Sequence, residues 1–305
     1  MNVPKVESYD HYVDTAYRRT KTVDIDKTIP WNMKKYILEK ERAKAFYDYL
    51  YSALTSIIEH FPQVEKLSSF YKELLDVTVN VDRYKKSLGA INWGRFMVKK
   101  LYYEFMKKKI GIEALFGRTK SSLKQIDSDF KFLDIVRKAL GNFPSVKSLP
   151  TVLIAGFPNT GKTSLLARLT GSTAEVNSYP FTTKNINISY MTYGNHKIQV
   201  VDTPGLLERP LSERNVIEMK AITALKYLAN LVLFLFDSSG SSGFKIEDQE
   251  KLYGEVKKLF TSKKIISVTN KCELDRSLKT DFYISCITGE GLDDLKKYLI
   301  KELLK

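Results

Sequence analysis

A glycine-rich segment follows a short apolar run and has the composition needed to bind a phosphate chain. It reads Gly156-Phe157-Pro158-Asn159-Thr160-Gly161-Lys162-Thr163 and comes directly after the apolar run 152–155. The glycines let backbone N–H groups turn inward toward phosphate oxygens, and a helix that begins at Lys162 adds the positive end of its dipole. Lys162 should reach the β- and γ-phosphates, and Thr163 should offer its hydroxyl to Mg²⁺. The order of strand, loop and helix favours a P-loop over an accidental glycine-rich turn. We include Ser164, the next residue, among the nucleotide-binding residues.

A second segment that could act on the same phosphates ends the apolar run 198–201. Asp202-Thr203-Pro204-Gly205 places a carboxylate at the edge of the predicted sheet, where Asp202 can hold a magnesium-bound water. The Gly205 N–H can meet the γ-phosphate, because a residue without Cβ lets the backbone approach closely. The motif is weak alone, and its value comes from its position about forty residues after the P-loop.

A threonine-containing segment lies between these two motifs. In Tyr179-Pro180-Phe181-Thr182-Thr183 a threonine could complete the magnesium shell and respond to the γ-phosphate, which is how a switch segment is ordered or released. Ordinary loop threonines are the alternative.

The segment Asn270-Lys271-Cys272-Glu273 points to the base of the nucleotide. It follows the apolar run 265–268 and has the arrangement of an Asn-Lys-x-Asp element, with Glu273 in the place of the aspartate. A carboxylate there accepts from guanine N1–H and N2–H₂, donors that adenine lacks, so we expect GTP and GDP rather than ATP. Asp275 is the alternative acceptor. The segment Ser285-Cys286-Ile287 resembles the serine-led loop that backs the guanine.

The elements that must position these motifs divide the chain into two predicted domains, residues 1–149 and 150–305. In the second, short β-rich runs alternate mostly with helical patterns, and Tyr193–His196 looks like a hairpin turn. This predicts an α/β P-loop domain whose sheet is six-stranded and mainly parallel, with one antiparallel edge strand. The predicted strands are 152–155, 186–193, 198–201, 231–236, 265–268 and 282–284.

The first domain should be an all-α helical bundle. Apolar residues recur at helical spacing over 31–60, 84–109 and 121–140. On the second of these helices, bases and aromatics fall outside the apolar stripe, an arrangement that suits either an RNA-facing surface or a solvated face with a further bundle contact. These residues are Lys85, Lys99, Lys100, Lys107, Phe96 and Tyr103.

Charge and cysteine content narrow the partners. The net charge is +14, and residues 1–150 hold 28 Lys and Arg against 18 Asp and Glu, so most of the excess lies there. This favours RNA over a membrane as partner, and neither DNA nor an oligomer is implied, although a lysine-rich background would give the same count. Cys272 and Cys286 alone argue against a disulfide scaffold or zinc site. No N-terminal apolar stretch follows Met1, so we expect a cytoplasmic protein.

Together these motifs resemble translation-factor-class GTPases, and the Gly-Phe-Pro-Asn-Thr-Gly-Lys loop with Tyr-Pro-Phe-Thr-Thr resembles their Obg group. The helical half is similar to the Nog-type nucleolar GTP-binding family, a resemblance carried by 70–77, Asp82-Arg83-Tyr84-Lys85 and 87–92. The resemblance implies a GTP-hydrolysing switch in large ribosomal subunit assembly, with rRNA or a pre-ribosomal particle as partner. A chain that stops soon after the GTPase domain suggests a short, archaeal-type member.

The resemblance also implies residue roles. Thr163 and Thr183 would be the magnesium threonines, with Asp202 acting through a water, and Phe181 to Asn185 would line the nucleotide. Lys162, Thr183 and Gly205 would then be the groups closest to the chemistry.

The sequence also bears on how the attacking water is positioned during hydrolysis. Leu206 stands where Ras-like enzymes place a water-orienting glutamine, which predicts slow intrinsic turnover. Asn159 could help bind K⁺, or it could only stabilise the loop turn. Alternative functions are a signalling or adaptor switch bound to proteins alone, a GTP-driven RNA- or tRNA-modification factor, and a P-loop kinase.

Overall fold

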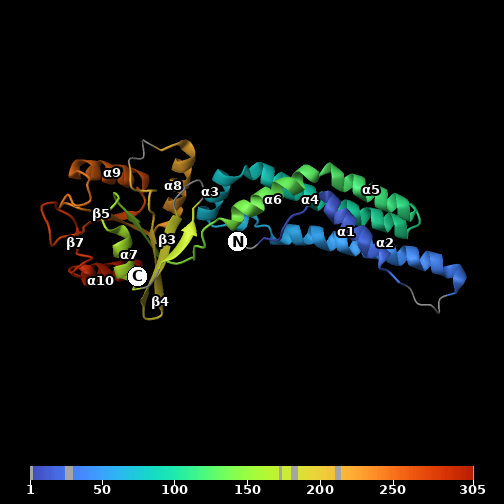
Figure 1. The fold of residues 1–305 in the computed structure, drawn as a ribbon, viewed down its shortest axis with the longest axis horizontal. Helices are drawn as coiled ribbons and strands as arrows, with labels where there is room; N and C mark the ends of the chain where they lie inside the picture. Colours follow the sequence, from blue (N-terminus) through green and yellow to red (C-terminus); the bar gives the residue numbers. More distant parts are fainter. Residues whose placement is uncertain (1–2, 25–29, 172–173, 180–184, 210–213, 305) are drawn as a thin grey trace. The chain divides into compact units, whose positions relative to one another are not determined.

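The computed structural model describes residues 3–24, 30–171, 174–179, 185–209 and 214–304. The chain forms two compact units, and their division is not contiguous along the sequence. The first unit comprises Met1–Lys66 and Val79–Gly141, and the second comprises Leu67–Thr78 and Asn142–Lys305. Figure 1 shows the first as a set of helices and the second as a sheet covered by helices.

The first unit is an antiparallel helical bundle. Long helices pack side by side through fully buried residues such as Phe46, Leu50 and Ile91. Aromatic rings of Tyr17, Phe46 and Phe116 contact one another at centroid distances from 4.6 to 5.4 Å. The helices are α1 (Tyr9–Lys21), α2 (Trp31–His60), α4 (Val81–Met106), α5 (Ile112–Gln125) and α6 (Asp127–Gly141), with a 3₁₀ turn at Val64–Lys66.

The predicted single helix over 121–140 is wrong. Helix α5 ends at Gln125, Ile126 takes a non-helical conformation with φ −107° and ψ 17°, and α6 begins at Asp127. The sequence hides this break because apolar residues continue at helical spacing across it, and the 6% exposed Ile126 is itself a core residue. No Gly or Pro marks the turn.

Helix α3 (Ser69–Thr78) belongs to the second unit, although it lies within the N-terminal half of the chain. It packs against α8 (Val216–Leu228). The Tyr71 hydroxyl of α3 donates to the carbonyl of Pro144 at 2.8 Å and accepts from the Val146 N–H at 2.9 Å. The second unit is therefore built from two separate parts of the sequence.

The second unit has a seven-stranded sheet in the order β2-β3-β4-β1-β5-β6-β7. Strands β4, β1, β5, β6 and β7 are parallel, while β3 pairs antiparallel with β4 and β2 pairs antiparallel with β3. This confirms the expected mainly parallel sheet with an antiparallel edge. The predicted count of six strands is wrong, because the described residues form seven, and the antiparallel edge comprises β2 and β3 instead of one strand. The strands are β1 (Thr151–Ala155), β2 (Glu175–Ser178), β3 (Asn185–Tyr193), β4 (His196–Asp202), β5 (Leu231–Phe236), β6 (Lys264–Thr269) and β7 (Phe282–Tyr283).

Strand β2 is the one that the sequence did not indicate. Its residues Glu175-Val176-Asn177-Ser178 contain one apolar side chain, and Val176 is 66% exposed at the sheet edge. A strand with a single apolar residue shows no hydrophobic alternation, so the periodicity on which strand prediction depends is absent.

Helices cover both faces of the sheet. Figure 1 shows α7 (Lys162–Thr170) and α10 (Leu292–Leu303) on one face, and α8 and α9 (Ile246–Leu259) on the other. Alternate side chains of β5 lie on opposite faces of the sheet. Leu233 packs in the core with residues of α7 and α10, while Phe234 contacts Tyr253 of α9. Parallel strands buried on both faces explain why these runs are continuously apolar.

Candidate nucleotide-binding site

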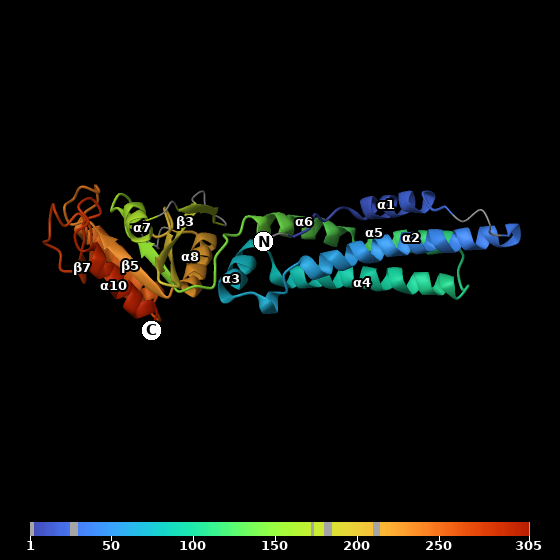
Figure 2. The ribbon, with the colours of Figure 1, turned by 90° about the horizontal axis from the view of Figure 1, so that it is seen from below.

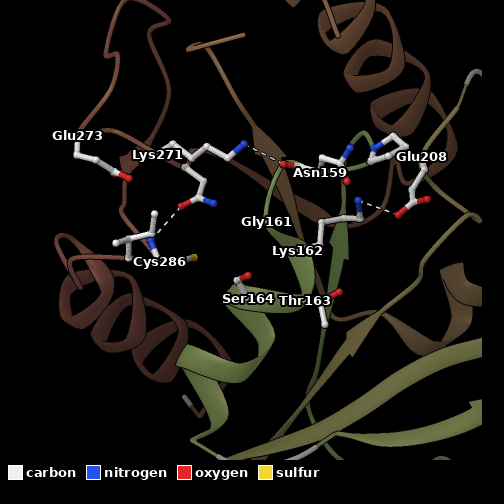
Figure 3. A pocket seen from close by; sticks show the side chains of 12 residues that line it. Asn159, Gly161, Lys162, Thr163, Ser164, Glu208, Lys271, Glu273 and Cys286 are labelled. Carbon is white, nitrogen blue, oxygen red and sulfur yellow. Dashed lines mark hydrogen bonds and ion pairs between the residues drawn. The ribbon is translucent and has the colours of Figure 1, made fainter. Parts of the chain in front are cut away.

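A pocket of about 540 Å³ lies at the carboxyl ends of the parallel strands, where the predicted motifs meet. Ligands of open α/β sheets bind at this edge. Figure 3 shows side chains from the P-loop, from the segment after β4 and from the segment after β6 facing the same space. The lining residues are Pro158, Asn159, Gly161, Lys162, Thr163, Ser164, Glu208, Asn270, Lys271, Glu273, Cys286 and Ile287.

Two glycines allow the backbone conformation of the P-loop. Gly156 has φ 138°, and a Cβ there would collide with the carbonyl oxygen of Leu235. Gly161, at the start of α7, has φ 99°, and a Cβ there would collide with the side-chain amide of Asn270. These positions therefore need glycine for both conformation and space.

Lys162 is held ready at the phosphate end of the pocket. Its side chain is only 5% exposed, and its Nζ donates to the carbonyl of Phe157 at 2.6 Å. The same Nζ forms an ion pair with Glu208 Oε1 at 2.9 Å, with the Glu208 side chain 16% exposed (Figure 3). Sequence reasoning missed Glu208, because nothing in the spacing of residues 162 and 208 indicates that they meet.

Thr163 and Asp202, both predicted to hold Mg²⁺, contact each other directly in the structure. The Thr163 hydroxyl donates to Asp202 Oδ2 at 2.8 Å, and the Asn187 amide donates to the same oxygen at 3.2 Å. Burial raises the pKa of Asp202, although these two hydrogen bonds and the nearby Lys162 oppose the rise. Asn187, on β3, was not predicted as a partner.

The chemistry of this pair fits Mg²⁺. The other carboxylate oxygen, Asp202 Oδ1, is buried and has no hydrogen-bond partner among the described residues. A buried ionised oxygen without a partner is costly, and a magnesium-bound water would satisfy it. The Thr163 hydroxyl and, through water, Asp202 are the described residues that would hold the ion. When bound, Mg²⁺ would neutralise charge on the phosphate oxygens.

Asn270 joins the phosphate and base ends of the pocket. Its amide nitrogen donates to the carbonyl of Thr160 in the P-loop at 2.8 Å, and its amide oxygen accepts from the Cys286 N–H at 3.1 Å. The side chain is 3% exposed, so both bonds are shielded from water. One buried amide therefore fixes the distance between the two ends.

Lys271 is held across the top of the P-loop. Its Nζ contacts Asp237 Oδ2 at 2.7 Å, the Ser241 hydroxyl at 2.7 Å and the carbonyl of Asn159 at 2.9 Å. Burial alone would raise the pKa of Asp237, but the hydrogen bonds from Lys271, Ser239 and Ser241 hold this pKa below its ordinary value. The backbone of Lys271 is left-handed, with φ 61°, as is that of Asn159. Backbone strain of this kind persists where the surroundings hold it, often at ligand sites.

The two candidate guanine acceptors differ in placement. Glu273 is exposed and lines the pocket beside Cys286 and Ile287 (Figure 3). Asp275 accepts hydrogen bonds from the N–H and hydroxyl of Ser277 at 3.1 and 2.7 Å and does not line the pocket. The geometry therefore favours Glu273 over Asp275 as the base-reading carboxylate.

Arg168 of α7 supports the loop behind the base, a contact that sequence reasoning also missed. Its Nε donates to the carbonyl of Cys286 at 2.7 Å, and one terminal nitrogen donates to the carbonyl of Ile287 at 3.1 Å. The helix that begins at the phosphates thus also bonds the loop at the base end. The Cys286 thiol is 8% exposed, and burial raises its pKa to about 11, so it is neutral near pH 7.

Some predicted residues do not line the pocket. Ser285 is fully buried, and its hydroxyl accepts from the Thr288 N–H at 3.0 Å, which shapes the loop rather than the pocket wall. The carbonyl of Gly205 accepts from Arg214 at 2.8 Å. Phe181, Thr182 and Thr183 lie outside the described residues, so their predicted roles stay predictions.

Comparison with known proteins agrees with this geometry. Residues 151–271 match the family described as 50S ribosome-binding GTPase, and residues 1–147 match the NOG1 N-terminal helical domain. An uncharacterized protein of Methanocaldococcus jannaschii is 41% identical over 286 residues, which cover 89% of this chain and 80% of that protein. Nucleolar GTP-binding protein 1 of Arabidopsis thaliana is 38% identical over 236 residues, which cover 73% of this chain and 35% of that protein.

This chain belongs to the Nog-type GTPase family. A P-loop GTPase domain preceded by a Nog-type helical domain is thus confirmed, and the family supports GTPase activity and guanine-nucleotide binding. The solved structure of nucleolar GTP-binding protein 1 from Plasmodium falciparum is 31% identical, with a TM-score of 0.47, and covers 53% of this chain and 90% of that one. The chain spans about a third of the length of its Arabidopsis relative.

Proposed function

We propose that this Nog-type GTPase is a switch in assembly of the large ribosomal subunit and that its helical half contacts rRNA. The observation that supports this most is the match of residues 1–147 to the NOG1 helical domain, together with relatives named as nucleolar. The nucleolus is where eukaryotic ribosomal subunits are assembled. The positive charge concentrated in residues 1–150 suits a polyanionic partner.

The pocket supports a definite division of labour during hydrolysis. Water attacks the γ-phosphorus, the bond to the β-phosphate oxygen breaks, and GDP and phosphate leave. Lys162 would stabilise charge on the β- and γ-phosphates after its ion pair with Glu208 is given up. Gly205 would meet the γ-phosphate through its N–H, and Glu273 would read the guanine. Thr183 would complete the magnesium shell.

Slow intrinsic turnover is part of the proposal. Leu206 follows Asp202-Thr203-Pro204-Gly205. Its hydrocarbon side chain cannot hydrogen-bond water, and because it is fully buried it cannot reach water either. A partner, a rearranged switch segment or K⁺ would have to position the attacking water. For K⁺ the candidate ligand is Asn159, which lines the pocket. Equal GTP turnover in K⁺ and Na⁺ would remove the cation from the proposal.

The function is tested by isolating the tagged full-length protein from cells in a GTP-analogue state and in a GDP state. We expect the bound material to be enriched in large-subunit rRNA in one state over the other, with the cytoplasm as the expected compartment. Absence of large-subunit rRNA in both states would contradict the ribosomal role and leave a protein-bound signalling switch as the better explanation.

A further inference from the structure

One face of α4 is exposed and carries aromatic side chains between lysines. Trp93 is 38% exposed, Phe96 60% and Tyr103 51%. Lys100 and Lys107 are also exposed and follow these aromatics at intervals of three and four residues. Because a helix turns through 3.6 residues, Trp93, Phe96, Lys100 and Tyr103 lie on one side of α4, and Lys107 directly follows the last residue of the helix. We name this side, together with the neighbouring exposed Lys99, the α4 face.

The α4 face has the wrong composition for a bundle contact. The buried side of the same helix already packs against the rest of the unit through residues such as Tyr84, Ile91 and Val98. Between residues 93 and 109 every exposed charged residue is a lysine, and the nearby Glu104 is only partly exposed. Figure 2 shows α4 along one edge of the bundle.

A second site with basic and aromatic side chains, a cavity of about 470 Å³, lies at the C-terminal end of α4. Its wall includes the 37% exposed Met106 and the 40% exposed Tyr36, together with Lys40, Lys108 and Lys109, against the single acid Glu39. The ammonium groups of Lys40 and Lys108 lie 4.6 and 5.3 Å from the centroid of the Tyr36 ring. The cavity thus repeats the combination of an aromatic ring and lysines.

We propose that the α4 face binds a single strand of RNA, with bases stacked on the aromatic rings and phosphates on the lysines. Aromatic platforms within a positive groove are the recurring means of holding single strands. Phe96 and Tyr103 are seven residues apart, so their rings are about 10 Å apart along the helix, room for more than one nucleotide between them. That the strand is RNA rather than DNA rests on the proposed function.

The same features argue against the other partners of a basic, aromatic surface. A helix that lies on a membrane separates an apolar face from a charged one, whereas here lysines and rings share one side. The centre of a protein interface is depleted of lysine. A continuous RNA duplex keeps its bases stacked inside, so it could use the lysines but not the rings.

The test compares full-length variants for binding of a short, labelled, mixed-sequence single-stranded RNA. The double variant Phe96→Ala/Tyr103→Ala should lose about tenfold or more in affinity, since stacking on each ring contributes substantially. The matched control is Ile135→Ala/Tyr193→Ala, which removes an apolar and an aromatic side chain that are 60% and 58% exposed elsewhere. The control should bind as the unmodified protein does. Thermal unfolding and GDP affinity should be unchanged in both.

Salt dependence separates the lysines from the rings. Lys99→Gln/Lys100→Gln should reduce the slope of log affinity against log salt by about 1.4, because each phosphate contact on a single strand contributes about 0.7. The ring variant should keep the original slope. A duplex of equal length should bind more weakly to the unmodified protein and be insensitive to the ring variant.

Several outcomes would overturn the proposal: equal losses in ring variant and control, equal binding of duplex and single strand, or binding to anionic phosphatidylserine vesicles without binding to RNA. The rRNA isolation experiment distinguishes this failure from failure of the proposed function. If rRNA is still enriched by the Phe96→Ala/Tyr103→Ala protein, the helical half contacts rRNA elsewhere and only the α4 face is wrong.

Discussion

The phosphate end and the base end of the pocket are built differently. At the phosphate end, Lys162 and Asp202 are almost fully buried, and each already has protein partners. At the base end the scaffold of Asn270 and Lys271 is firmly bonded, but Glu273, the residue proposed to read the base, is exposed. At the phosphate end, nucleotide binding must therefore displace the ion pair between Lys162 and Glu208. At the base end it only adds a contact to the exposed carboxylate of Glu273. Affinity and selectivity should respond separately to mutation.

The largest expected effect is at Lys162. Lys162→Ala removes the buried cation and leaves the Glu208 carboxylate unpaired beside the phosphates, so we expect GDP affinity to fall about 100-fold or more. Titration calorimetry or a fluorescent GDP analogue would measure this. Adding Glu208→Gln to Lys162→Ala should restore part of the loss, because it removes the repulsion. An unchanged affinity in Lys162→Ala would contradict the assignment of the phosphate end.

Glu273 should control selectivity with a smaller loss of affinity. Glu273→Gln replaces a charged acceptor of two guanine donors, and we expect the preference for GDP over ADP to fall about 10- to 100-fold. Glu273→Asp should keep the preference. The matched control is Asp275→Asn, which alters the neighbouring carboxylate that bonds Ser277 instead of lining the pocket. A larger loss in Asp275→Asn would reverse the two roles.

Glu208→Gln should act in the opposite direction. The substitution removes the Glu208 charge, which competes with the phosphates for Lys162. Because this ion pair is only partly buried, we expect a modest effect: GDP should bind about three- to tenfold more tightly and dissociate more slowly. The nucleotide-free protein should lose stability, because Lys162 then lacks its counter-ion. Glu290→Gln is the control, since it breaks an ion pair with Arg276 on a segment that does not line the phosphate end. Faster GDP release in Glu208→Gln would disprove the competition.

The smallest effect concerns Asp202 and pH. Burial raises the pKa of Asp202, so its ionised form destabilises the folded, nucleotide-free protein. Below the pKa of the unfolded state, near 4, the carboxyl is protonated in both states and the destabilisation is absent. The destabilisation grows as pH rises and is complete above the pKa of the folded state. Asp202→Asn should therefore gain a few degrees in Tm over the unmodified protein at neutral pH, and this gain should shrink toward pH 4. Its GDP affinity should depend less strongly on Mg²⁺, because Thr163 remains but the carboxylate that would hold a magnesium-bound water is lost. A pH-independent Tm difference would argue against burial as the cause.

The parts of the site that could be predicted from the sequence are those whose residues stand together in short motifs. The P-loop, Asp202 and Asn270 each stand in a short motif after an apolar strand, and the structure brings them together. Glu208 and Arg168 were missed because their partners, Lys162 and the carbonyl of Cys286, are 46 and 118 residues away and follow from packing alone. Spacing cannot reveal a contact that only the tertiary fold creates.

The fold was predictable to a similar degree and for similar reasons. Apolar residues at helical spacing predicted α2 and α4, and short, continuously apolar runs predicted the parallel strands of the sheet. The break at Ile126 was hidden because a buried apolar residue occupies it, and β2 was hidden because only one of its four residues is apolar. The membership of α3 in the second unit was also beyond the sequence, since amphipathic spacing shows that a helix is buried but not against which partner.

Helix α3 has a practical consequence for dissecting this GTPase. A fragment that begins near residue 150 retains every strand of the sheet but omits the helix that packs on α8, leaving that surface of α8 open to water. Such a fragment should aggregate or unfold at lower temperature, and adding residues 67–78 as a separate peptide should shield the surface again. We therefore expect the shortest stable form of the GTPase unit to be a fusion that joins residues 67–78 to the downstream chain.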